Sequence, residues 1–120
     1  MISNRRRFGM MDYASAVEGL LTACSIFLSK CLASLGEEER RYGRYLVSRL
    51  DLVEDRSWMY DGEDRERISR ALSLLEKARD VITRVIGGGD YSARDVELLI
   101  RSMEGTCREL KSMALSARAP

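Results

Sequence analysis

The sequence contains no histidine and no glutamine, and its single asparagine is Asn4. The absence of histidine removes the usual general base, the commonest nitrogen ligand of zinc and one member of a catalytic triad. Acidic residues lie mainly on charged helix faces, opposite the apolar stripes, so no inward carboxylate cluster is predicted to hold a metal ion. We therefore expect a non-enzymatic protein with no cofactor and no metal site.

Proline occurs only at the last position, Pro120, so no helix is kinked by proline. Long uncharged runs are also missing. The longest, Gly19 to Ser29, is far shorter than the roughly 20 residues that span a bilayer. The net charge of +1 lacks the basic excess typical of proteins that bind nucleic acid or a membrane surface. These features predict a cytoplasmic protein with no membrane partner.

Lysine is scarce as well, because arginine outnumbers it by 17 to 3. Few thermolabile amides together with many charged residues that can form ion pairs are typical of proteins from hot-living organisms. A GC-rich genome would also favour arginine over lysine. The composition therefore predicts a thermophile protein, with genome composition as the alternative explanation.

Apolar residues recur every three or four positions in four segments, which is the pattern of amphipathic helices. The predicted helices are 12–35, 37–55, 62–86 and 93–117. They form one domain, 12–120, which follows a basic tail, 1–11, expected to be flexible; Met10 and Met11 are alternative starts to Met1. Similar helix lengths and short links favour an all-α, antiparallel up-down-up-down four-helix bundle.

The breaks between the segments carry helix-end signals. Gly36 is predicted to stop the first helix in a left-handed conformation, and the glycines 87–89 mark the clearest turn. Asp61 with Asp64, and Ser92 with Asp95, have the spacing of capping boxes. In the second helix, the residues expected in the core are Tyr42, Leu46, Leu50 and Val53.

The first helix carries a second seam in addition to its apolar core face. At helical spacing, where a surface helix normally shows Lys, Glu and Arg, this seam has small or uncharged residues. We expect it to contact a protein partner, either a second copy in a homodimer or a member of a larger complex. Alternatively, the helix is surrounded by the rest of the bundle. The seam is Ser15, Gly19, Thr22, Ile26, Ser29 and Ala33.

A basic and aromatic cluster at the start of the second helix supports another function. Arg40, Arg44 and Arg49 have no acidic residue four positions earlier to form a helical ion pair. Arginine binds phosphate, and tyrosine stacks on bases. The alternative hypothesis is thus a nucleic-acid-binding accessory subunit, unless Glu37 to Glu39 neutralise the patch. Its residues are Arg40, Arg41, Arg44, Tyr45 and Arg49.

Three cysteines complete the candidates. Antiparallel alignment of the first and last helices places Cys107 level with position 22, close to Cys24. A Cys24 to Cys107 disulfide would close a long loop, contributing about 4 to 5 kcal/mol in the chain-entropy model. Buried free thiols are the alternative, because cysteine is often simply a small core residue.

Overall fold

The computed structural model describes residues 2–55 and 65–118, and side chains over 14–53 and 66–112. The described residues form four helices and no strand, so the all-α class is confirmed. Their mutual contacts are those of a helical bundle. The helices are α1 (Ile2–Ala33), α2 (Glu37–Asp55), α3 (Arg65–Ile86) and α4 (Ala93–Arg118).

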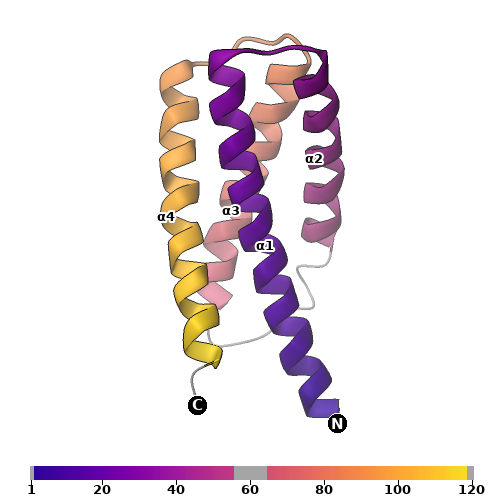
Figure 1. Ribbon diagram of the computed structural model, residues 1–120, viewed down its shortest axis with the longest axis vertical. Coiled ribbons are helices and arrows are strands. Elements are labelled where there is room, and N and C mark those ends of the chain that lie inside the picture. The colour runs from indigo at the N-terminus through magenta and orange to yellow at the C-terminus, as the bar shows by residue number, and fades with distance from the viewer. Residues whose placement is uncertain (1, 56–64, 119–120) are drawn as a thin grey trace.

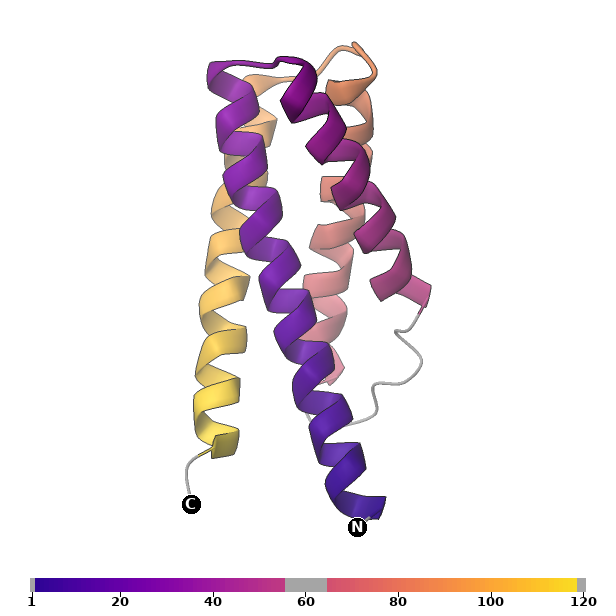
Figure 2. The same cartoon turned by 45° about the vertical axis from the view of Figure 1, so that its right-hand side comes forward.

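Helix α1 contacts all three other helices. In Figure 1 it crosses the front of the bundle, with α4 on one side, α2 on the other and α3 behind. Both chain termini lie at one end of the molecule, and the links after α1 and after α3 lie at the other end (Figure 1). In Figure 2, α1 lies in front of α4 near the links, and its other end extends beyond the end of α2.

The predicted helix bounds agree closely for α2 and α4, whereas α1 begins much earlier than expected. It starts at Ile2 instead of Asp12, so residues 2–11 belong to the helix. Arginine and methionine are strong helix formers, and no proline interrupts this segment. The predicted boundary at residue 12 was therefore wrong, because it followed the apolar pattern and not the helix propensity.

The core is the merged apolar faces of the four helices. Leu46 and Leu50 are buried as predicted, but Tyr42 is 46% exposed, which corrects its assignment to the core. The neighbouring residue, Gly43, is buried instead. A Cβ atom on Gly43 would lie 2.6 Å from Ile86 Cγ2 and 2.9 Å from Phe27 Cζ, so α2 approaches α1 and α3 more closely than a larger residue allows.

The helix ends differ from the prediction at one residue, Gly36. Gly36 does not have the predicted left-handed conformation; its N–H donates to Glu39 Oε2 at 3.1 Å and its carbonyl accepts from Arg40 N, so it caps the start of α2. Gly88, with φ of 78°, makes the left-handed turn after α3. Ser92 Oγ accepts from Asp95 N at 3.4 Å, as predicted. The Asp61 and Asp64 pair lies outside the described residues.

One stretch of α1, Ala14–Ala33, is long and apolar enough to cross a membrane by length and composition. This corrects the sequence-based estimate, which counted only the uncharged run and stopped at the flanking charges. In the bundle, 44% of the stretch is buried. Val17, Leu21 and Leu28 have no exposed surface, and a helix that packs against three others needs this composition for its core contacts.

Candidate functional site

The predicted seam of α1 lies together on one exposed surface, which we call the α1 face. All six of its residues are exposed: Ser15, Gly19, Thr22, Ile26, Ser29 and Ala33. Ile26, at 58%, is the most exposed large apolar side chain among the described residues. Contact with three helices therefore does not surround α1, because its core face uses the opposite side of the helix.

A groove of about 500 Å³ runs along one side of the α1 face, between α1 and α2. Because the lining residues of α1 include a glycine and an alanine, the groove is open beside the projecting Ile26. Tyr42 forms part of the α2 wall, and its ring centroid lies 5.8 Å from that of Phe27. The lining residues are Gly19, Thr22, Ala23, Ile26, Phe27 and Lys30 of α1, with Glu38, Glu39 and Tyr42 of α2.

A second groove, of about 400 Å³, lies on the other side of the α1 face, between α1 and α4. Thr22, Ser25 and Ile26 line it from α1. The exposed, oppositely charged Glu104 and Arg108 line it from α4. The α1 face is consequently a ridge between two grooves. The far wall of one includes Glu38 of α2, and the far wall of the other includes Glu104 and Arg108 of α4.

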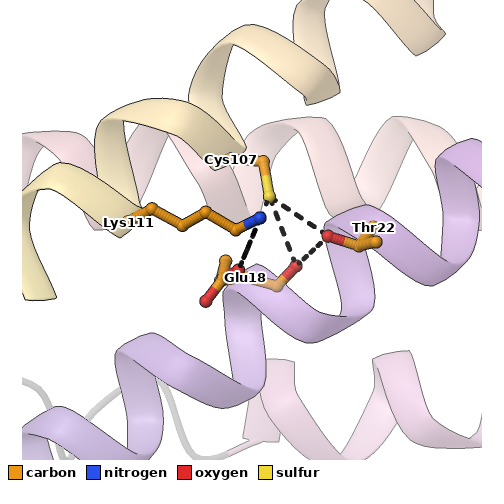
Figure 3. A network of polar contacts seen from close by, with 4 residues as sticks. All are labelled: Glu18, Thr22, Cys107 and Lys111. Atoms are coloured by element: carbon orange, nitrogen blue, oxygen red, sulfur yellow. Dashed lines mark hydrogen bonds and ion pairs between the residues drawn. The ribbon is translucent and has the colours of Figure 1, made fainter.

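A network of polar contacts joins α1 to α4 beside this second groove (Figure 3). The Thr22 hydroxyl donates to the Glu18 carbonyl at 3.1 Å, and Cys107 Sγ lies 3.1 Å from the same hydroxyl oxygen. Lys111 Nζ lies 3.7 Å from Glu18 Oε1. Cys107 Sγ also lies 3.8 Å from the Glu18 carbonyl oxygen, so residue 107 lies beside the turn of α1 between Glu18 and Thr22, and Lys111 lies beside Glu18.

The three cysteines are free and buried, and Cys107 contacts Thr22 while Cys24 lies in the core. Burial raises the pKa of the Cys24 thiol to about 12. Burial also raises the pKa of Cys31, and the Glu39 carboxylate adds to this effect. Since the thiolate is the reactive form, neither thiol is activated as a nucleophile. Among the described residues, no cluster of three or more acidic or cysteine side chains could hold a metal ion.

The five residues of the predicted nucleic-acid patch are all exposed on α2. They do not share one side, because Arg40 and Arg49 are nine residues apart and so point in roughly opposite directions around the helix. Arg44 Nη2 lies 3.7 Å from Glu37 Oε1, which partly compensates its charge. Tyr45 lies 5.9 Å from Tyr42, centroid to centroid, and the two rings form an exposed aromatic pair.

The comparisons with known proteins assign no relative. No family model, curated protein or solved structure matches the chain. The function is therefore inferred from the two exposed surfaces, the α1 face and the arginine and tyrosine surface of α2.

Proposed function

We propose that this protein is a non-enzymatic helical assembly module, which self-associates or joins a larger complex through the α1 face. The observation that carries the proposal is the exposure of all six α1-face residues, with Ile26 at their centre. Burying this surface removes apolar area from water and desolvates no charged side chain within the face.

The contrast between α1 and its neighbours supports the same function. The exposed side of α4 includes Arg94, Glu97, Arg101, Glu104 and Arg108, as expected for a solvated helix face. On α1, the charged residues of the 14–33 stretch are Glu18 and Lys30, and both flank the face instead of interrupting it. An uncharged ridge beside charged surfaces is typical of the centre of an interface and its polar rim.

The proposal takes the bundle to be antiparallel, with up-down-up-down connections. The short links at one end of the molecule and the two termini at the other support this arrangement (Figure 1). Each helix then lies beside its neighbour in sequence, and none of the four described helices covers the exposed α1 face.

The test is the native mass of the chain and its dependence on the α1 face. Light scattering after gel filtration is applied to recombinant protein and to protein isolated under native conditions from the cells that make it. We expect a mass above 13.6 kDa in at least one sample, and a return towards 13.6 kDa in Gly19→Arg or Ser29→Arg. A monomer in both samples, or a larger mass that both variants retain, would overturn the proposal.

The aromatic pair of α2 supports nucleic-acid binding as a second candidate function. Tyr42 and Tyr45 are 46% and 55% exposed, and an exposed pair of rings can stack on unpaired bases. Salt-sensitive retention of single-stranded nucleic acid, reduced in Arg40→Ala with Arg44→Ala, would support this function. The absence of retention at low salt would exclude it.

We place this function in the cytoplasm of a thermophile. Transfer of α1 to a membrane would withdraw Val17, Leu21 and Leu28 from the core and expose the other helices, which opposes a membrane location. Recovery of the chain in the membrane pellet after cell fractionation would contradict the location. A thermal midpoint of about 45 to 65 °C, the mesophile range, would contradict the thermophile origin.

A further inference from the structure

We propose that the occupant of the α1 face is a second copy of the chain, packed antiparallel across a two-fold axis level with residue 24. This inference rests on the proposed function and identifies its partner. The two-fold axis brings the grooves, the exposed Ile26 and the charges of α4 each against a complementary group of the second copy.

The first step is the register that the axis produces. Ser15 of one copy is level with Ala33 of the other, Gly19 with Ser29, and Thr22 with Ile26, because each pair is centred on residue 24. Each layer thus contains at most one large side chain. Alternation of small and large residues across facing positions is the condition for close packing of two helices.

The second step is the fit between Ile26 and the groove beside α2. In this register, Ile26 of the second copy lies level with residue 22 and on the α2 side of the face. The positions 19, 22, 23 and 26 surround that point with the i, i+3, i+4, i+7 spacing of a hole that accepts one side chain. These four residues line the groove of about 500 Å³, so the most exposed apolar side chain of α1 enters the groove beside it.

The third step is charge complementarity on the α4 side. Cys107 contacts both Thr22 and Glu18, which places Glu104 level with about residues 23 to 25 and Arg108 level with about residues 19 to 21. The axis then brings Arg108 of the second copy to within roughly 3 to 9 Å of Glu104 along the helix direction, on the same side of the face. Both side chains are exposed and line the groove between α1 and α4. Symmetry repeats this pair, giving two ion pairs across the interface.

A parallel arrangement fits these observations less well. In a parallel two-fold dimer every residue of the α1 face meets its own copy, so that Ile26 faces Ile26 and Gly19 faces Gly19. The Ile26 layer is then overpacked and the Gly19 layer leaves a void, and both reduce stability because protein interfaces are closely packed. The antiparallel register avoids both problems.

Thiol cross-linking distinguishes the two arrangements. Gly19→Cys and Ser29→Cys are prepared separately and treated with a short bismaleimide linker, alone and as a mixture that has been allowed to exchange subunits. In the antiparallel dimer, residue 19 lies level with residue 29 of the other copy, whereas two copies of residue 19 are separated by roughly 15 Å along the axis. We expect covalent dimers from the mixture only. The unchanged chain, whose three cysteines are buried, is the control and should give none.

Charge reversal tests the register independently of the cysteine variants. Arg108→Glu alone and Glu104→Arg alone should each weaken the homodimer roughly tenfold or more, because like charges then face each other. A mixture of the two variants should restore a stable heterodimer. Circular dichroism checks that both variants remain folded, which is expected since both side chains are exposed.

Four outcomes would overturn the inference. They are covalent dimers from Gly19→Cys alone, no covalent dimer from the mixture, charge variants that dimerise like the unchanged chain, and a recombinant chain that is monomeric at high micromolar concentration. If Gly19→Arg nevertheless removes the chain from an assembly isolated from its own cells, the proposed function stands and only its partner was misidentified. If Gly19→Arg has no effect on any assembly, both proposals fail.

Discussion

Cys107 Sγ lies 3.1 Å from Thr22 Oγ1, across the contact between α4 and α1. Thr22 belongs to the exposed α1 face, whereas Cys107 is 8% exposed, so this contact joins the edge of the face to the core. The pair contributes to the alignment of α1 with α4 (Figure 3). This alignment determines the level at which Glu104 and Arg108 border the proposed interface.

The position of Cys107 leads to a prediction about cysteine oxidation. Since Cys107 faces Thr22 and Cys24 lies in the core, we expect three free thiols per chain in protein purified without reductant and then denatured. Reaction with a chromogenic disulfide reagent measures this number, with a fully reduced sample as the control. One free thiol before reduction and three after it would indicate the Cys24 to Cys107 disulfide.

A second prediction concerns Gly43, where α2 closely approaches α1 and α3. In Gly43→Ala the new Cβ would lie 2.6 Å from Ile86 Cγ2 and 2.9 Å from Phe27 Cζ, so side chains or the helix must shift. We expect the free energy of unfolding to fall by about 1 to 3 kcal/mol, as for other overpacked cores. Urea denaturation followed by circular dichroism measures the change.

Gly105→Ala is the matched control for this substitution. Gly105 also lies inside a helix, but apart from the adjoining residues and backbone of α4 itself, no atom lies within 4 Å of the position that its Cβ would take. Alanine there should raise stability by about 0.5 to 1 kcal/mol, because glycine is the poorer helix former. Equal effects of the two substitutions would show that α2 is not as close to Ile86 and Phe27 as described.

The sequence was sufficient to predict the class of fold, the helix count in the described segments and most of the core, because apolar spacing determines which side of each helix is buried. It was misleading at Tyr42, since a large aromatic residue appeared more suitable for the core than the adjacent Gly43. The signal was present in the isolated glycine, which inside a helix often marks close packing. The sequence pattern does not contain the distance between α2 and its neighbours, because that distance depends on the packing of α1, α2 and α3 together.

The candidate site, like the fold, was predicted only in part. The predicted alignment placed Cys107 level with residue 22, and in the structure Cys107 contacts Thr22 and also Glu18, one turn away. The level along the helix did not show whether Cys107 reaches Cys24, because side chains at positions 22 and 24 point about 200° apart around the helix. The grooves beside the α1 face were not predicted either, since each is formed by two helices and no single helix pattern contains it.

A third prediction tests the cap of α4. Ser92 Oγ accepts a hydrogen bond from Asp95 N at 3.4 Å, and Ser92→Ala removes this acceptor. We expect a loss of about 0.5 to 1 kcal/mol of stability, the low end for an N-cap because the bond is long. Ser102→Ala, at an exposed position within the same helix, should not destabilise the protein. A comparable loss in both variants would argue against a capping role.

A fourth prediction follows from the buried Cys24 thiol. Its pKa rises from 9.0 to about 12 in the folded chain because burial disfavours the thiolate. The folded state therefore retains a proton that the unfolded state releases between these two values, and the free energy of unfolding falls as the pH rises through this range. Below pH 9 the contribution is fully present.

Urea denaturation at pH 8 and pH 10, for the unchanged chain and for Cys24→Ala, isolates this effect. We expect the unchanged chain to lose about 1 kcal/mol more than the variant between the two pH values, since each pKa unit corresponds to about 1.4 kcal/mol. The lost packing in Cys24→Ala lowers stability at both pH values and cancels in the comparison. All other side chains are common to the two proteins, so equal pH dependence of the two would mean that water reaches Cys24 and that α1 is less firmly packed than its buried face indicates.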